Sequence, residues 1–576
     1  MRQIKFSLLI FATLMFLASC SATKKMTKEQ KKEVTKKEVK KEYKMIPQKV
    51  TTLFNDKDLI NWQLTHPFDK GYFPGMSVEK AYNSILKDIP AQTVIVAVVD
   101  AGIDINHEDL KDVIWTNTDE IPGNNIDDDH NGYVDDVHGW NFLGAKDGRM
   151  VTGEQLELTR IVKKYRDQWK DKELKDIAPQ DTVMFKMYKR AEAELEKKLQ
   201  EAKGLDFRLK GLEAMASGIF KTLKDYLHTD TLTQEAVENI STDDPAVMQA
   251  RSFYLNGLTP EYIKEFANYV EGQLKYNLNL DFNGRIQGDN IDDLNDRNYG
   301  NPNVMPPTAD ELHGTHVAGI IAAVRNNGKG GNGVADHVLI MPVRAVPDGD
   351  EYDKDIALAF RYAVDNGAKI INCSFGKYYS PHKEWVWDAI KYAADHDVLI
   401  VNGAGNEGKN MDLYGANMSY PNDGDVPGKE IADNFINVGA IGPNYGADLV
   451  ASFSNYGKET LDIFSPGVKI YAPVPYTNKY KHLRGTSMAS PDVAGVAALI
   501  RSRFPNLTAS EVKHIIMDSG LAPQIKVIVP QEDDYIGDPK LDFFGNLSRS
   551  GKIVNAYNAL IMAKKLCDEK KKAGKK

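Results

Sequence analysis

The 576-residue chain is poor in cysteine and has no excess of positive charge. Its three cysteines are Cys20, Cys373 and Cys567, and no disulfide framework is apparent from them. The formal net charge is −9, and lysine-rich stretches occur only towards the two ends. We therefore expect no nucleic-acid partner. The apolar run at residues 6–17 is too short to span a membrane comfortably.

Three short segments contain the residue types that activate a serine. VAVVDAG ends an apolar, mostly β-branched run at Asp100, as a buried parallel strand would. HGTHVAG begins with His313, and GTSMASP places Ser487 just before an apolar helical run. A serine hydroxyl needs a base to take its proton and a carboxylate to orient that base. We expect Ser487 to attack, His313 to act as base and then acid, and Asp100 to hold the imidazole.

Each segment alone has a structural alternative. An aspartate after a strand is usually a cap or turn residue, HGTH could be half of a metal site or a loop, and GTSMASP could simply begin a helix. A fourth segment, NGAGNEG, follows the apolar strand at residues 398–401. The amide of its Asn406 could donate to the oxyanion of a tetrahedral intermediate. Alternatively, Asn406 is a turn residue with a left-handed backbone. The segments taken together favour catalysis.

The chain resembles the subtilisin-like serine peptidases, or subtilases. The resemblance lies in VVDAGID around Asp100, HGTHVAGII from His313, GAGNEG around Asn406 and GTSMASP around Ser487. Asp492 stands where many members have histidine, and this leaves the charge preference of the substrate pocket open. The resemblance implies that the pocket for the residue before the scissile bond has two walls, Ser374, Phe375, Gly376 and Gly403, Ala404, Gly405.

The resemblance implies an α/β fold with a doubly wound, mostly parallel sheet. It also implies endopeptidase activity through an acyl-enzyme, with no cofactor required for the chemistry. It covers about residues 92–142 and 313–520, and a closing helix is expected near 551–565. We therefore assign residues 92–142 and 313–565 to a subtilisin-like domain and residues 566–576 to a basic tail.

The two ends of the expected insertion lie beside the site. Asp100 and His313 are 213 residues apart, whereas simple subtilases have a few tens of residues there. The excess, residues 143–312, indicates a helical subdomain of three to five amphipathic helices that starts and ends near the active-site rim. It could be a lid or substrate-selecting arm, or a subdomain that merely shields the body. Helical stretches are expected near residues 191–199, 211–226 and 260–276.

Residues 1–19 predict a secretory signal peptide, because Arg2 and Lys5 precede the apolar run. The run ends in LASC, which resembles a bacterial lipobox and implies cleavage before Cys20 and its lipidation, with acyl chains such as palmitate. Multiple acyl chains anchor a protein stably to a membrane. We expect an exported protein, lipid-anchored to a bacterial membrane and facing the periplasm or the cell exterior. The alternatives are an ordinary signal peptide with a chance cysteine, or an uncleaved anchor.

Two further segments precede the Asp100 strand. Residues 20–44 are dominated by lysine and glutamate and indicate a solvated tether. Residues 45–91 include Trp62 and other aromatic residues, enough apolar surface to pack on the catalytic domain. They do not form a convincing inhibitory prodomain. Either this extension substitutes for a prodomain, or the enzyme folds without one.

One acidic loop resembles the first half of a calcium loop. Asp127, Asp129 and Asn131 occupy positions 1, 3 and 5, and a glycine follows. Position 12 would be His138 rather than glutamate, so the loop is not an EF-hand. Asp135 is the fourth candidate ligand for a structural Ca²⁺, and the alternative is a plain acidic turn. By resemblance, Asp109 and Asn326 could share a second calcium site.

The leading hypothesis is a membrane-tethered subtilisin-like endopeptidase whose partners are protein or peptide substrates. The first alternative is a catalytically silent surface protein whose helical insertion binds a partner. The second is a peptide ligase or cyclase, in which the same serine transfers the acyl group to an amine. Nothing in the sequence selects transfer over hydrolysis or predicts an oligomeric state.

Overall fold

The computed structural model covers most of the chain. No helix in the part of the chain that it describes is both long and apolar enough to cross a membrane. The expected signal peptide, Cys20 and the tether lie outside the described residues. The described residues are 57–67, 73–413, 415, 418–532 and 535–573.

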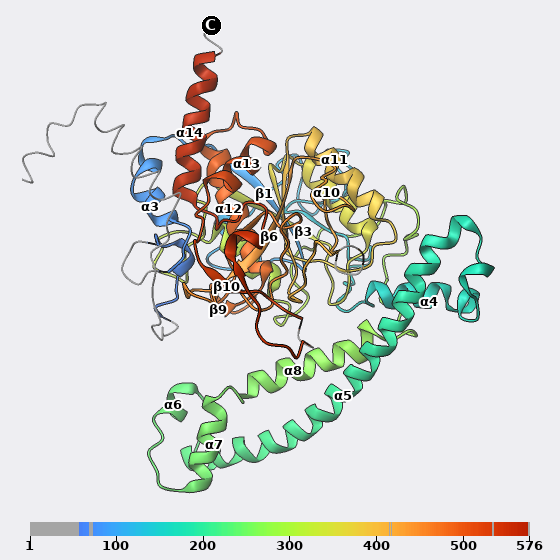
Figure 1. The fold of residues 1–576 in the computed structure, drawn as a ribbon, viewed down its shortest axis with the longest axis vertical. Helices are drawn as coiled ribbons and strands as arrows, with labels where there is room; N and C mark the ends of the chain where they lie inside the picture. The colour runs from blue at the N-terminus through green and yellow to red at the C-terminus, as the bar shows by residue number, and fades with distance from the viewer. Residues whose placement is uncertain (1–56, 68–72, 414, 416–417, 533–534, 574–576) are drawn as a thin grey trace, which may run out of the picture.

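A seven-stranded sheet in the order β2-β3-β1-β4-β5-β6-β7 forms the centre of the molecule (Figure 1). All neighbouring strands are parallel, as predicted. The strands are β1 (Val94–Asp100), β2 (Trp140–Asn141), β3 (Val338–Arg344), β4 (Ile370–Cys373), β5 (Leu399–Gly403), β6 (Phe435–Ile441) and β7 (Ile463–Pro466). Two antiparallel pairs lie outside it, β8 (Ile470–Val474) with β9 (Lys479–Leu483) and β10 (Lys526–Ile528) with β11 (Leu541–Phe543).

Helices cover both faces of the sheet, which explains why its strands are apolar on both sides. Along β1, Val96 and Val98 point into the core beneath α12, while Ala97 and Val99 point towards α10. Both faces are therefore buried, and the expected doubly wound α/β fold is confirmed. One face carries α9 (His313–Ala322), α12 (Thr486–Arg503), α13 (Ala509–Ser519) and α14 (Ala556–Ala573), and the other carries α10 (Asp353–Asp365) and α11 (Lys383–Asp395).

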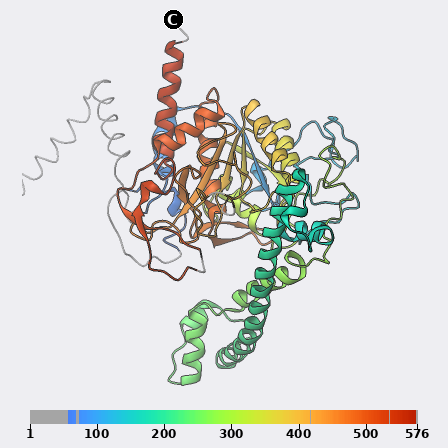
Figure 2. The same cartoon turned by 45° about the vertical axis from the view of Figure 1, so that its right-hand side comes forward.

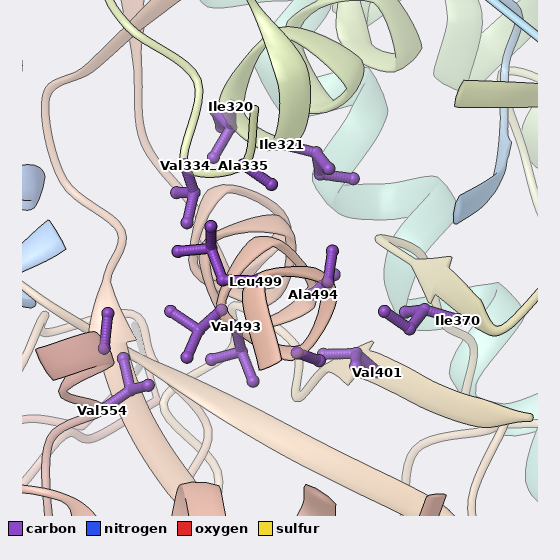
Figure 3. Packing of buried hydrophobic residues seen from close by; sticks show 14 of the residues in the cluster. Ile320, Ile321, Val334, Ala335, Ile370, Val401, Val493, Ala494, Leu499 and Val554 are labelled. Atoms are coloured by element: carbon purple, nitrogen blue, oxygen red, sulfur yellow. The ribbon is translucent and has the colours of Figure 1, made fainter. Parts of the chain in front are cut away.

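Helix α12 runs through the larger core. Figure 3 shows Val493 and Leu499 of this helix packed among side chains from α9 and the sheet, including Ile320 and Val401. Every residue of α12 is buried except Ser487. Ser487, at the first turn of this buried helix, is half-buried.

The N-terminal extension packs on the body from residue 57 onwards. Trp62 is fully buried, and its Nε1 donates to the carbonyls of Val468 and Lys469. Met76 and Val78 join the core that contains α12. The extension therefore completes that core. Its helix is α3 (Val78–Asn83), with short 3₁₀ turns at Trp62–Leu64 and Ile85–Asp88.

The insertion, residues 143–312, contains five α-helices, within the predicted range. The stretches expected near 191–199 and 211–226 are one helix, α5, of 46 residues. We call the described residues outside the insertion the body. Figures 1 and 2 show α5 and α8 running side by side away from the body. We call α4 and the start of α5 the base, and α6, α7 and the end of α5 the tip. The helices are α4 (Glu157–Trp169), α5 (Thr182–Leu227), α6 (Gln234–Glu238), α7 (Pro245–Leu255) and α8 (Pro260–Gly272).

Helix α14 differs from the helix expected near residues 551–565. It begins at Ala556 and ends at Ala573, and so it includes most of the expected basic tail. Its apolar residues pack against α3 and α13, whereas its last turns are lysine-rich and exposed. The remaining short turns are Lys111–Val113, Leu174–Asp176, Pro179–Asp181 and Phe544–Asn546, with a π turn at Gln273–Asn277.

Candidate active site

Asp100 and His313 meet at the carboxyl edge of the sheet. Asp100 is the last residue of β1 and is 1 % exposed, and His313 is the first residue of α9. Nδ1 of His313 lies 2.8 Å from Oδ1 of Asp100. A side chain on Gly314 would collide with the carbonyl of Gly102, since its Cβ would lie 2.3 Å from that oxygen. Glycine at this position therefore lets the start of α9 approach the aspartate.

This contact determines the state of the imidazole. A carboxylate can only accept, so Nδ1 carries the proton and Nε2 is left as the basic nitrogen. Burial lowers the pKa of His313, but the charge and hydrogen bond of Asp100 outweigh burial and raise the pKa above its ordinary value of 6.5. His316 differs, because burial lowers its pKa to about 3 and its Nε2 lies 3.0 Å from the carbonyl of Lys481. His316 is thus a structural residue of the HGTH motif.

Ser487 is the second residue of α12, and its side chain lies at the surface end of that buried helix. Its Oγ donates to the carbonyl of Ser374 at 3.1 Å. Among the described residues, no hydrogen bond joins it to His313. Such bonds are often long or misaligned in a free enzyme and tighten when substrate binds. The strand end and the two helix starts therefore bring the three predicted residues to one edge of the sheet, with the serine turned towards the pocket wall.

Asn406 is oriented by the start of the same helix. The backbone N–H of Thr486 donates to Oδ1 of Asn406 at 2.9 Å. Because an N–H group can only donate, the atom that faces it must be the oxygen. Among the residues that the structure describes, none accepts a hydrogen bond from Nδ2 of the exposed Asn406. This group lies beside the first backbone N–H groups of α12, which have no partner within the helix. These donors suit an anion at the mouth of the site.

The two expected pocket walls leave neighbouring strands. Residues 374–376 follow β4, and residues 403–405 lie at the end of β5, which pairs with β4. Oγ of Ser374 donates to the carbonyl of Ser487 at 2.9 Å. That carbonyl has no helical partner because Pro491 lacks an N–H group. Asp492 is buried inside α12 and does not line the pocket.

The insertion forms one side of the space beside the catalytic pair. A cavity of about 620 Å³ is lined by Asp100 and His313 on the body. Asn268, Tyr269 and Gly272 of α8 line the same cavity. A helix of the insertion therefore faces the cavity beside His313.

Arg344, at the end of β3, was not identified from the sequence. It is fully buried, and its Nε donates to the carbonyl of Ala101, next to Asp100, at 2.7 Å. Its Nη2 donates to the carbonyl of Val151 at 2.6 Å and lies 3.4 Å from Glu311. Burial raises the pKa of Glu311 to about 7, although Arg344 opposes the shift. Arg344 thus ties the aspartate loop to both ends of the insertion, through partners too distant in sequence to form a motif.

Two aspartates of the acidic loop form a cluster of carboxylates with Glu120, which was not predicted from the sequence. Oxygens of Glu120, Asp127 and Asp129 lie within 4.8 Å of one another. The Nδ2 group of Asn131 donates to Asp129 at 3.0 Å. The carboxylate of Asp135 lies outside this group and accepts from the backbone N–H groups of residues 123–125. Glu120 lies outside the loop motif, so no local spacing pointed to it.

Among the described residues, no hydrogen bond joins Asn326 to Asp109. Asn327 donates to Oδ1 of Asp109 instead, while Asn326 hydrogen-bonds with Asn332. Lys329 of the same loop pairs with Glu108. The second calcium site, through Asp109 and Asn326, stays a prediction.

A match to the Subtilase family covers residues 91–545. The "Thermophilic serine proteinase" of Bacillus sp. (strain AK1) is 42 % identical over 195 residues, which are 34 % of this chain and 43 % of that protein. "Subtilisin DY" of Bacillus licheniformis is 38 % identical over 209 residues, 35 % of this chain and 68 % of that protein. "Thermitase" of Thermoactinomyces vulgaris is 38 % identical over 192 residues, 33 % of this chain and 61 % of that protein.

These relatives match the chain over about half to two thirds of their own length, whereas the family match spans more than half of this chain. The parallel sheet, the Asp100–His313 pair at its carboxyl edge and the serine at the start of α12 agree with that match. The chain belongs to the subtilase family.

Proposed function

We propose that the protein is a serine endopeptidase that hydrolyses peptide bonds of proteins or peptides through an acyl-enzyme intermediate. The observation that carries the proposal is the 2.8 Å contact between Asp100 and His313, because it leaves Nε2 of His313 as a basic nitrogen at the same edge of the sheet as the half-buried Ser487. Family membership and the names of the matched relatives support the same activity.

In the first half of the reaction, Oγ of Ser487 attacks the substrate carbonyl carbon, and Nε2 of His313 takes the hydroxyl proton. The negative charge of Asp100 stabilises the imidazolium. The carbonyl oxygen becomes an oxyanion that accepts hydrogen bonds from Nδ2 of Asn406 and from the start of α12. The intermediate collapses, the C–N bond breaks, and His313 gives the proton to the leaving amine.

In the second half, a water molecule attacks the acyl carbon and His313 takes its proton. The bond between the acyl carbon and Oγ then breaks. His313 returns the proton to Ser487, and the free acid leaves. An amine in place of water would give a ligase or cyclase by the same steps, with no change in the residues involved.

The test is labelling of the detergent-solubilised full-length protein with a fluorophosphonate, followed by location of the labelled peptide by mass spectrometry. We expect labelling at Ser487 that is lost in Ser487→Ala and strongly reduced in His313→Ala. A folded protein that stays unlabelled contradicts the proposal and favours the silent binding protein. Product masses from a peptide substrate, with and without an added amine, distinguish hydrolysis from acyl transfer.

We propose further that the protein is exported and anchored to a bacterial membrane through lipidated Cys20. The support is the sequence alone, which places this cysteine directly after an apolar run that follows Arg2 and Lys5. Incorporation of an alkyne-tagged palmitate, lost in Cys20→Ser, tests the anchor. Equal incorporation in both proteins contradicts it.

We also propose a structural Ca²⁺ held by Glu120, Asp127 and Asp129. Ligands on opposite sides of an ion bonded at about 2.3–2.6 Å lie about 5 Å apart, so oxygens that all lie within 4.8 Å of one another could share one ion. N–H groups bond these carboxylates, but Oε2 of Glu120, both carboxylate oxygens of Asp127 and Oδ1 of Asp129 each accept from one described donor and keep a second lone pair for a cation. Calcium should raise the Tm relative to chelator, and Glu120→Gln should reduce the gain. An unchanged Tm contradicts the site.

A further inference from the structure

Tyr378 joins the segments that follow the two pocket walls. It lies two residues after the first wall, and its hydroxyl donates to Oε2 of Glu407, two residues after the second wall. Nδ2 of the buried Asn455 donates to the Tyr378 hydroxyl at 2.9 Å and to the carbonyl of Ala404, inside the second wall, at 2.9 Å. The phenol ring therefore bridges the two sides of the pocket.

The bridge engages one oxygen of the Glu407 carboxylate. Oε2 of this residue accepts from the hydroxyl of Tyr378, from Nδ2 of Asn455 at 3.1 Å and from the backbone N–H of Asn406 at 2.9 Å. The ammonium group of Lys409 lies 3.8 Å from the centre of the Tyr378 ring. Burial and the charge of Glu407 raise the pKa of Tyr378 well above its ordinary value, so the hydroxyl stays protonated and keeps donating.

Helix α5 of the insertion contacts Tyr378 and its neighbour Tyr379. Nη2 of Arg190 donates to the carbonyl of Tyr378 at 2.8 Å. The guanidinium lies 4.1 Å from the ring centre of Tyr379, and the hydroxyl of Tyr379 donates to Glu194 at 2.6 Å. Tyr379 is buried in the apolar cluster of the base. Side chains on one face of α5 thus bind two consecutive residues of the body, Tyr378 and Tyr379, which closely follow the first pocket wall in the sequence.

We propose that Tyr378 determines which side chain the pocket accepts before the scissile bond, and that Arg190 is the positioning residue that holds Tyr378 in place. The inference rests on the proposed peptidase function. While Tyr378 bonds to Glu407, three donors hold Oε2 and offset part of the carboxylate charge, and the pocket favours an uncharged side chain. Without the hydroxyl, the carboxylate becomes available to a cationic side chain. The insertion therefore influences substrate choice from behind the pocket wall.

The test compares labelling rates of Ser487 by two peptidyl phosphonates, one with a benzyl and one with a guanidino side chain. In Tyr378→Phe, the guanidino-to-benzyl rate ratio should rise about tenfold, the size expected for losing one hydrogen bond to a charged group. Adding Glu407→Gln to Tyr378→Phe should abolish the rise, because the carboxylate charge is gone. An unchanged ratio in Tyr378→Phe overturns the role of Tyr378.

A plain fluorophosphonate, which carries no side chain, counts the assembled sites in each variant. If the plain probe labels Ser487 and the ratio stays constant, the specificity proposal fails while the proposed function stands. If the wild-type protein takes no plain probe, the proposed function fails and this inference fails with it.

The part played by the insertion is tested by Arg190→Ala, Arg190→Lys and Arg208→Ala. Arg208 is an exposed arginine of the same helix and serves as the matched control. Arg190→Ala should move the ratio in the same direction as Tyr378→Phe, by about threefold for one lost hydrogen bond. Arg190→Lys should restore part of the wild-type ratio, and Arg208→Ala should leave it unchanged. Equal ratios for Arg190→Ala and Arg208→Ala overturn the positioning role.

Discussion

The body and the tip of the insertion are stabilised in different ways. The body surrounds parallel strands and α12 with apolar side chains on both faces of one sheet. The tip has a small core of its own, to which no described residue of the body contributes. Between them, the base shares its core with Tyr379 of the body. The insertion therefore shares a core with the body at its base and has a separate core at its tip.

Buried charges strengthen the join at the base. Nζ of Lys377, on the body, lies 2.8 Å from a carboxylate oxygen of Glu157 in α4 and 2.8 Å from one of Asp353 in α10. Arg160 of α4 pairs with the same Glu157 and donates to the carbonyl of Glu351 on the body. A buried pair is costly to break, because the remaining charge is left without a partner. The base should therefore move with the pocket, whereas the tip can move without it.

The largest effect should come from the body. In Ser487→Ala, we expect kcat to fall by about 10⁶-fold, as is typical when a triad loses its nucleophile. Stability should hardly change, since Ser487 is the one residue of α12 that is not buried. Peptide hydrolysis and thermal unfolding measure the two effects. Residual activity near the wild-type level would place the nucleophile elsewhere.

Asp100→Asn should reduce kcat by about 10⁴-fold, since the imidazole loses the charge that holds its tautomer. The substitution should also shift the acidic limb of the pH profile of kcat/KM. The raised pKa of His313 places that limb above pH 6.5 in the wild type, because the base must be neutral. Without the Asp100 charge, burial dominates and the limb should move to lower pH. If the acidic limb lies at the same pH in both proteins, Asp100 does not raise the pKa of His313.

The same pair contributes to stability with a defined sign. Its contribution should be complete below the ordinary pKa of 6.5 and should be lost as the pH rises through the raised pKa of folded His313. Unfolding measured across this range in the wild type and in Asp100→Asn should show a pH-dependent difference that shrinks as the pH rises. A constant difference would contradict the assigned direction.

At the base, Lys377→Met should lower the free energy of unfolding by about 3–5 kcal/mol, because Glu157 and Asp353 are left with too few cationic partners. Lys210→Met is the matched control, since the exposed Lys210 of α5 pairs with Asp206 in the same helix. The control should change stability by less than about 1 kcal/mol. Urea unfolding measures both, and equal effects would show that the base is not joined as described.

The smallest effect should come from the tip. If residues 216–258 are replaced by a short flexible turn, we expect the thermal unfolding of the body and the cleavage of short peptides to stay near wild-type values. The physical reason is that the core of the tip contains no body residue. A lower Tm of the body, or a large loss of peptide cleavage, would remove the distinction between base and tip.

Much of the fold and of the candidate site could be predicted because the signals are local. The run ending at Asp100 predicts a buried strand, and small residues after His313 and Ser487 predict closely packed helices. The length of α5 was not predicted. Gly204 lies between the two expected stretches and Gly211 begins the second, but their surroundings are open and each costs a helix about 1 kcal/mol. Packing of α5 against α7 and α8 offsets such costs.

By itself, the sequence determined the α/β class, the residues of the candidate triad and the position of the insertion, since each follows from neighbours along the chain. The tertiary structure decided which groups meet across long separations. Arg344 reaches Ala101 across 243 residues, and Glu120 joins the acidic loop from outside its motif. The contact from Arg190 to Tyr378 spans 188 residues. Such contacts depend on how separate elements pack, and no local spacing of residue types encodes them.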